Sequence, residues 1–189
     1  MNKPEFIILG GSAGSFQVIF GIIKKLPANF NVPILIVIHR GKDKNTHIEE
    51  VIAHQSSVKV QEVKDKENII NGIVYIAPAD YHVLIESEKI FSLDNSEPIL
   101  FSRPSIDVSM QSAAEVYGSK LLAVLFSGAN SDGAAGMEII KNRGGQIFVQ
   151  DPKDAEVDIM PLAAVQKNAG IKKMPTKEIE SLLINISIK

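Results

Sequence analysis

Short, uninterrupted runs of isoleucine, leucine and valine recur along the chain and alternate with segments whose apolar positions have helical spacing. Continuous apolarity is typical of strands buried on both faces of a sheet. The predicted strands cover residues 6–9, 33–38, 73–76, 121–126 and 146–149, and the predicted helices cover residues 15–25, 46–54, 106–117, 133–142, 160–168 and 176–184. A strand followed by a helix, repeated in this way, predicts an α/β fold: a single domain with a doubly wound, mainly parallel sheet flanked by helices.

One interval breaks this alternation. Residues 81–86 and 89–93 have the composition of strands and are joined by only two residues, Ser87 and Glu88. Two strands with so short a connection pair with each other in opposite directions. We therefore predict an antiparallel β-hairpin here, at an edge of the sheet.

Composition limits the classes of function. The chain has 20 basic and 22 acidic residues, a net charge of −2, so no global positive field favours nucleic acid. It contains no cysteine, which excludes disulfides, thiolate metal sites and a cysteine nucleophile. The N-terminal sequence lacks the long apolar region of a signal peptide, and no apolar run approaches the roughly 18 residues of a membrane span. We expect a cytoplasmic protein with one compact domain and no membrane insertion.

Polar side chains that can carry chemistry follow three of the predicted strands. Ser12 lies in the glycine-rich turn GGSAGS at residues 10–15, His39 directly follows the second strand, and Asp132 lies in the loop SGANSDGAAG at residues 127–136. The carboxyl ends of parallel strands meet at one edge of a sheet, so these side chains are expected together there. A serine, a histidine and a carboxylate in contact form the catalytic arrangement of a serine hydrolase.

Each of these residues also has a plain structural interpretation. A glycine-rich turn binds phosphate in many nucleotide-binding proteins, although this one lacks both the P-loop sequence and a complete G-x-G-x-x-G. His39 could cap its strand, and Asp132 could cap the helix that follows it. Among the other histidines, His82 is the second choice as a site residue, whereas His47 and His54 lie in a polar, helical segment.

Five motifs together resemble one known family. They are GGSAGS, the strand that ends in His39, YIAPADYHV at residues 75–83, RPSIDV at residues 103–108, and SGANSDGAAG. In this order and spacing they resemble the CheB-type protein-glutamate methylesterases over nearly the whole chain. The resemblance implies a serine hydrolase that cleaves glutamyl methyl esters on the cytoplasmic domain of chemoreceptors or related signalling proteins, with deamidation of receptor glutamines as a second activity in many members.

The resemblance also assigns roles to residues. Ser12 aligns with the family's nucleophile, His39 with its general base and Asp132 with the acid that orients the base. Such a triad needs no metal, so we predict no cofactor. Further candidates for substrate binding are Arg103, His82, Ala13 and Ala129. The Arg103 side chain could equally form a salt bridge to Asp107.

Two departures from the family pattern are visible. Ala13 stands where typical members have threonine, and Ala129-Asn130-Ser131 replaces a Met-Gly-Ala segment, so we expect the rim of the site to differ in shape and polarity. Because the first strand begins only a few residues after Met1, we expect a catalytic domain over residues 1–189 without the family's receiver domain. The alternative interpretation is a non-catalytic regulatory or binding module that keeps the methylesterase fold.

Overall fold

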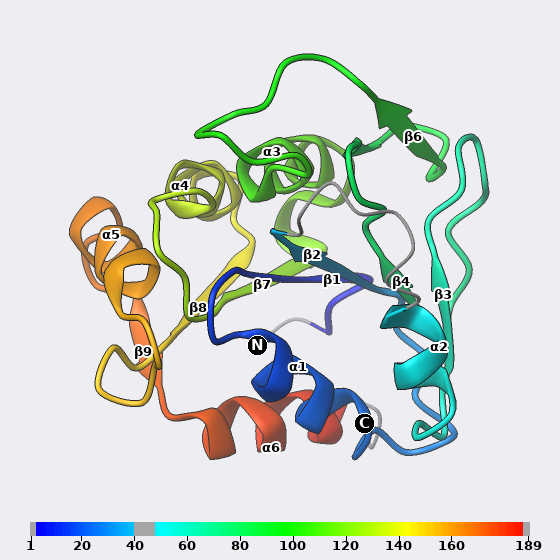
Figure 1. Ribbon diagram of the computed structural model, residues 1–189, viewed down its shortest axis with the longest axis horizontal. Helices are drawn as coiled ribbons and strands as arrows, with labels where there is room; N and C mark the ends of the chain where they lie inside the picture. The colour runs from blue at the N-terminus through cyan, green and yellow to red at the C-terminus, as the bar shows by residue number, and fades with distance from the viewer. Residues whose placement is uncertain (1–2, 40–47, 187–189) are drawn as a thin grey trace.

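A central sheet lies between two layers of helices in the computed structural model, which describes residues 3–39 and 48–186 (Figure 1). Helices α1 (Phe16–Ile23) and α6 (Thr176–Ile186) cover one face of the sheet. Helices α3 (Ile106–Tyr117) and α4 (Ala134–Asn142) cover the other face. The predicted α/β architecture, with helices on both faces, is confirmed.

The main sheet has seven strands in the order β3-β4-β2-β1-β7-β8-β9, and every neighbouring pair is parallel. The strands are β1 (Phe6–Gly11), β2 (Ile34–Ile38), β3 (Lys59–Glu62), β4 (Ile73–Ile76), β7 (Leu121–Leu125), β8 (Gln146–Gln150) and β9 (Lys172–Met174). The five strands predicted from apolar runs are all present. The two strands that the sequence did not reveal, β3 and β9, are the outer ones, and their residues are partly polar and exposed.

The apolar runs form strands because both faces of the sheet are covered. Along β1, Phe6 and Ile8 point into the core beneath α3 and α4, whereas Ile7 and Leu9 point into the core beneath α1 and α6. All four side chains are fully buried. Since side chains alternate between the two faces of a strand, a strand with two covered faces must be apolar at every position.

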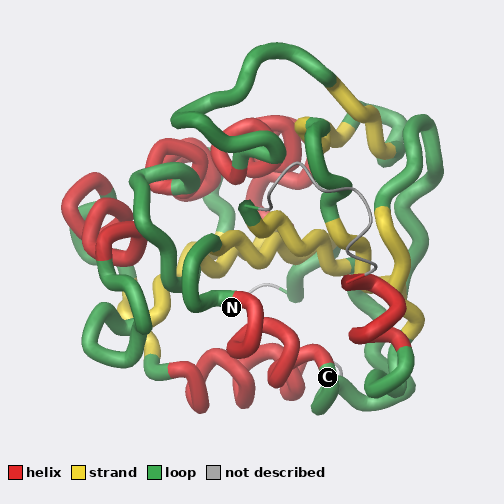
Figure 2. Tube along the Cα trace, viewed as in Figure 1, coloured by secondary structure: helices red, strands yellow, loops and turns green. Residues whose placement is uncertain are grey.

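The predicted hairpin is confirmed, with β5 (His82–Ile85) antiparallel to β6 (Phe91–Asp94). Its predicted place at the edge of the main sheet is wrong, because the two strands form a sheet of their own that packs on α3 (Figure 2). Val83 and Phe91 share one buried cluster with α3. The hairpin is apolar mainly on one face, which suits packing against a helix better than extending a sheet buried on both faces.

The remaining elements are short or peripheral. They are α2 (Ile48–Ala53), the 3-10 turn η1 (Gly118–Lys120) and α5 (Ile159–Lys167). Helix α2 corresponds to the helix predicted at 46–54, of which residues 46 and 47 lie outside the described residues. Within residues 3–39 and 48–186, no helix is long and apolar enough to cross a membrane.

Candidate active site

Three predicted site residues follow adjacent strands at the centre of the sheet. Strand β1 pairs with β2 on one side and with β7 on the other, so the loops that leave β1 and β7 adjoin each other. The Ser12 N–H donates to the Ser127 carbonyl at 2.9 Å, and the His39 N–H donates to the Gly11 carbonyl at 3.2 Å. Ligand sites of open α/β sheets lie at such a point, beyond the carboxyl ends of the strands where the winding direction changes.

The turn after β1 presents the half-buried Ser12 next to the loop after β7. The Ser15 hydroxyl closes this turn by donating to the Ser12 carbonyl at 2.7 Å. Gly128, in the opposing loop, leaves little room for a side chain. A Cβ there would lie 2.6 Å from Met160 Cε and 3.0 Å from Ser12 Cβ, so any side chain would push on the serine or on α5.

The His39 imidazole and the Asp132 carboxylate are in direct contact. His39 Nε2 lies 2.8 Å from Asp132 Oδ2. The histidine side chain is 10% exposed and the aspartate side chain is fully buried. In the sequence these residues are 93 positions apart, so the fold alone brings them together as the motifs predicted.

The Asp132 carboxylate accepts hydrogen bonds from the start of α3 as well as from His39. Its partners there are the backbone N–H groups of Ile106 (2.7 Å) and Asp107 (3.0 Å) and the Ser105 hydroxyl (2.9 Å). Burial alone would raise the pKa of Asp132, but the hydrogen bonds from His39, Asp107 and Ile106 outweigh burial and hold this pKa below its ordinary value. The carboxylate is therefore an ionised, acceptor-only partner for His39.

Asp107, in the first turn of α3, accepts a hydrogen bond from α4, just as Asp132, before α4, accepts hydrogen bonds from α3. Its Oδ1 accepts a hydrogen bond from the Gly136 N–H, in the first turn of α4, at 2.6 Å. Burial raises the pKa of Asp107 to about 6; the Gly136 N–H opposes this rise, and the nearby Asp132 charge adds to it. Two carboxylates thus link the starts of two helices, one of them ionised and the other protonated below about pH 6.

The second ring nitrogen of His39 contacts a residue that sequence reasoning missed. Ser102 Oγ lies 3.1 Å from His39 Nδ1. Within the described ranges, no hydrogen bond joins the Ser12 hydroxyl to the imidazole. Ser102 directly precedes the RPSIDV motif and had no distinguishing signal of its own, because neither its spacing nor its neighbours indicate contact with a residue 63 positions earlier.

Arg103, predicted to bind substrate or to pair with Asp107, is bonded elsewhere. Its Nε and Nη2 donate to Asp80 Oδ1 at 3.1 and 2.6 Å, and its Nη1 donates to the carbonyls of Asn95 and Ser96. The pairing with Asp107 was wrong, because Asp107 points toward α4 instead. The guanidinium anchors the segment between β6 and α3, which arches over the helices in Figure 1.

The other candidate substrate-binding residues have different surroundings. His82 is 1% exposed; its Nδ1 accepts from the Ser105 N–H at 3.0 Å, and its Nε2 lies 3.2 Å from the Glu97 carbonyl. This imidazole supports the start of α3 and has no ring nitrogen left for a ligand. Ala13 and Ala129 are both exposed beside the Ser12 turn. His47 lies outside the described residues, and His54 is exposed.

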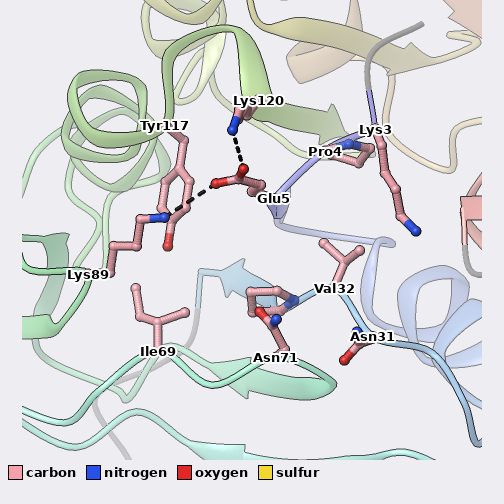
Figure 3. A pocket seen from close by; sticks show the side chains of 11 residues that line it. Lys3, Pro4, Glu5, Asn31, Val32, Ile69, Asn71, Lys89, Tyr117 and Lys120 are labelled. Atoms are coloured by element: carbon pink, nitrogen blue, oxygen red, sulfur yellow. Dashed lines mark hydrogen bonds and ion pairs between the residues drawn. The ribbon is translucent and has the colours of Figure 1, made fainter.

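A separate hollow of about 420 Å³ lies at the opposite edge of the sheet (Figure 3). It is lined by residues that precede strands, among them Glu5, Asn71 and Lys120. Hydrogen bonds from Lys120 and Lys89 to Glu5 lower the pKa of this glutamate. Because this hollow lies at the amino ends of the strands, it is distinct from the site formed by Ser12, His39 and Asp132 at their carboxyl ends. Among the described residues, no group of three or more histidines and carboxylates is arranged to hold a metal ion.

A serine on a strand-to-helix turn, beside a buried histidine–aspartate pair on a parallel α/β sheet, defines a protein of the serine hydrolase class. The family model for CheB methylesterase matches residues 7–183, so the chain belongs to the CheB methylesterase family.

Individual relatives agree with this assignment. A protein of Leptospira interrogans is 41% identical over 182 residues, which cover 96% of this chain and 94% of that protein. The protein-glutamate methylesterase/protein-glutamine glutaminase 1 of Carboxydothermus hydrogenoformans is 36% identical, but the chain spans only 56% of its length. The crystal structure of the Thermotoga maritima CheB methylesterase catalytic domain matches 98% of this chain with a TM-score of 0.90 and 31% identity. The resemblance and the hydrolase class predicted from the motifs are confirmed.

Proposed function

We propose that this chain hydrolyses glutamyl methyl esters on proteins, with Ser12 as nucleophile, His39 as general base and Asp132 as the residue that orients the base. The observation that carries the proposal is the 2.8 Å contact between His39 Nε2 and Asp132 Oδ2, at the sheet edge where the Ser12 turn lies. Membership of the CheB methylesterase family and the names of the relatives support the substrate class.

The reaction follows from the roles of the two ring nitrogens. Because Asp132 accepts the proton on Nε2, Nδ1 is the nitrogen that takes the proton of the Ser12 hydroxyl. Ser12 Oγ attacks the ester carbonyl carbon, the bond to the methoxy oxygen breaks, and Nδ1–H protonates that oxygen as methanol leaves. Water then attacks the acyl-enzyme with Nδ1 as base, which frees Ser12 and a glutamate side chain.

Backbone N–H groups are suited to stabilise the oxyanion of the tetrahedral intermediate. The proposed donors are Ala13, which directly follows the nucleophile, and Ala129, in the loop after β7. Both residues are exposed, and in the described part of the chain neither N–H has an internal hydrogen-bond acceptor. The departures from the family pattern at these positions change side chains and keep the backbone N–H donors.

The same intermediate serves deamidation, because an amide of glutamine differs from the ester only in its leaving group. Nδ1–H would then protonate the leaving nitrogen, and ammonia would replace methanol as the product. The relatives named both methylesterase and glutaminase support this second reaction.

The proposed partner is the methylated cytoplasmic domain of a chemoreceptor or of a related signalling protein, and the proposed location is the cytoplasm. Exposed apolar side chains flank the site on both sides and suit a protein substrate. Phe101, one residue before the His39 partner Ser102, is fully exposed. On α5, whose Met160 packs against Gly128, Ile159 is 50% exposed and Leu162 is 39% exposed.

The test is release of methanol from a methylated chemoreceptor cytoplasmic fragment. We expect the unmutated chain to release methanol and Ser12→Ala to release none above background. Ser181→Ala is the matched control, because it removes an exposed hydroxyl that bonds the Lys177 carbonyl within α6. Full activity of Ser12→Ala, or no release by the unmutated chain from any methylated receptor fragment, would overturn the proposal in favour of a non-catalytic module.

A further inference from the structure

The hollow at the amino ends of the strands has a cationic lining (Figure 3). Among the described residues, the lysines Lys3, Lys89 and Lys120 line it together with one carboxylate, that of Glu5. Three positive charges against one negative charge leave a formal charge of +2 in the hollow, although the whole chain has a net charge of −2. A concave surface with one sign of charge attracts small ions of the opposite sign. The hollow is therefore suited to an anion.

Glu5 engages only part of this positive charge. Its Oε2 accepts a hydrogen bond from Lys89 Nζ at 3.3 Å, and its Oε1 accepts one from Lys120. An ammonium group has three N–H donors, so both lysines keep donors for a second acceptor. Lys3 forms no ion pair with any residue in the described part of the chain. Lys89 and Lys120 thus already meet at one oxyanion, and cationic donors remain for another.

The Tyr117 hydroxyl is a further donor, and it points into the hollow (Figure 3). The residue is 7% exposed, its ring stacks on Phe6 with 4.7 Å between the ring centres, and Lys89 Nζ lies 5.2 Å from the centre of the tyrosine ring. Burial raises the pKa of this hydroxyl, which therefore keeps its proton. Within residues 3–39 and 48–186 the hydroxyl has no hydrogen-bond partner. An acceptor bound beside Lys89 would satisfy it.

The lining favours an organic phosphate over other anions. A phosphate monoester carries about −1.5 to −2 charges at pH 7 and has three strong acceptor oxygens, which match the formal charge and the free donors of the hollow. The apolar side chains of Val32, Pro33 and Ile69 form another part of the lining, and an inorganic ion would leave them uncovered. The volume of about 420 Å³ lies within the range of small-molecule sites.

We propose that this hollow binds a small phosphate monoester, whose phosphate oxygens accept hydrogen bonds from Lys89 and Tyr117 and whose organic group packs against Ile69 and Val32. The charges of the other two lysines add to the attraction. The hollow lies at the ends of β1, β2 and β7 opposite to those that carry the Ser12 site. The inference therefore does not rest on the proposed function.

The test is isothermal titration calorimetry at pH 8 with phenyl phosphate and, separately, with inorganic phosphate. We expect phenyl phosphate to bind with a Kd below about 1 mM, and at least about threefold more tightly than inorganic phosphate because its ring covers the apolar lining. Loss of one donor in Lys89→Gln or Tyr117→Phe should raise this Kd by about three- to tenfold. Glu5→Gln, which removes the opposing charge, should lower the Kd.

Two variants serve as controls. Lys66→Gln removes the same charge as Lys89→Gln, but Lys66 is paired with Glu86 outside the hollow, so its Kd should equal that of the unmutated chain. Ser12→Ala should also leave the Kd unchanged. Tyr117→Phe keeps the ring that stacks on Phe6, so we expect its Tm to stay unchanged and its weaker binding to report the hydroxyl alone.

Four results would overturn the inference. They are binding of phenyl phosphate only above about 10 mM, equal weakening in Lys66→Gln and Lys89→Gln, loss of binding in Ser12→Ala, and binding of inorganic phosphate as tight as that of phenyl phosphate. The first two would indicate unspecific attraction to surface charge, the third a ligand at the Ser12 site, and the fourth a free anion in place of an ester. None of them depends on whether the chain releases methanol.

Discussion

At the scale of single residues, the site depends on a carboxylate that stays ionised although it is fully buried. Asp132 does so because the hydrogen bonds from His39 and from the start of α3 lower its pKa by more than burial raises it. The stability that this ionised group contributes is present above its unfolded pKa and is lost as the pH falls through its lower folded pKa.

Asp132→Asn should therefore affect catalysis far more than it affects the fold. The amide has one acceptor atom in place of two, so at least two donors lose their partner: either His39 Nε2 and the Ile106 N–H, or the donors to Oδ1. By comparison with the orienting aspartate of other serine hydrolases, we expect kcat to fall by about 10³- to 10⁴-fold. We expect the free energy of unfolding to fall by about 1–3 kcal/mol because buried donors are left unpaired. Kinetics and urea unfolding measure both effects, and a kcat within tenfold of the unmutated value would contradict the role of Asp132.

At the scale of elements, helices α3 and α4 begin next to each other, and a carboxylate at the start of each accepts hydrogen bonds from the other. Asp132, just before α4, accepts from the start of α3, and Asp107, at the start of α3, accepts from the first turn of α4. Free N–H groups at helix starts favour such acidic partners. The two carboxylates lie close enough for the charge of Asp132 to raise the pKa of Asp107.

Asp107→Asn tests this arrangement through the pH dependence of stability. The native state keeps a proton on Asp107 up to about pH 6, whereas the unfolded state releases it near the ordinary value of 3.8. The native state thus binds more protons in this window, and stability falls as the pH rises through it. A neutral side chain removes this loss, so we expect Asp107→Asn to raise the free energy of unfolding at pH 8 by about 1–2 kcal/mol, allowing for partial solvent screening. We expect no change at pH 4. A larger loss of stability at pH 8 than at pH 4 would contradict the assignment.

The close approach of α5 to the Ser12 turn is tested by a pair of glycine substitutions. Gly128→Ala places a methyl group against Met160 and Ser12, so we expect it to reduce kcat by at least about tenfold through displacement of the nucleophile. Gly21→Ala is the matched control, because Gly21 lies in α1 with no atom within 4 Å of its added Cβ. We expect this control to keep kcat and to gain about 0.5–1 kcal/mol in stability. Equal kcat values in the two variants would show that the glycine loop does not position Ser12.

At the scale of the whole molecule, the sequence predicted the repeated strand–helix units and the buried strands at the centre of the sheet. The five inner strands have apolar residues on both faces, and short continuous apolar runs of this kind are typical of buried parallel strands. Strand β9 was missed because its Lys172 and Lys173 are exposed at an edge, where a sheet imposes no apolar pattern. The contact of Ser102 with His39 was missed because a loop of irregular structure gives no periodic signal. For Arg103 the sequence left substrate binding and a salt bridge to Asp107 open, and it did not indicate the observed partner, Asp80, because spacing along the chain does not show which way the side chain points.

The exposed turn at Phe101 allows a prediction about the substrate. If a protein covers the site, Phe101 lies within its footprint, and burial of its ring favours binding. Phe101→Ser should raise KM for a methylated receptor fragment by about five- to tenfold and leave kcat unchanged. For a small soluble ester, which cannot reach the turn and the triad together, both constants should stay the same. An unchanged KM for the receptor fragment would exclude the turn from the contact surface.

The central claim, that Ser12 is activated by the His39–Asp132 pair, is tested most directly by mapping the site of a fluorophosphonate adduct by mass spectrometry. We predict a single adduct on Ser12 that forms at least about 100-fold more slowly in His39→Ala. An adduct on another serine, or a labelling rate that does not depend on His39, would contradict the claim.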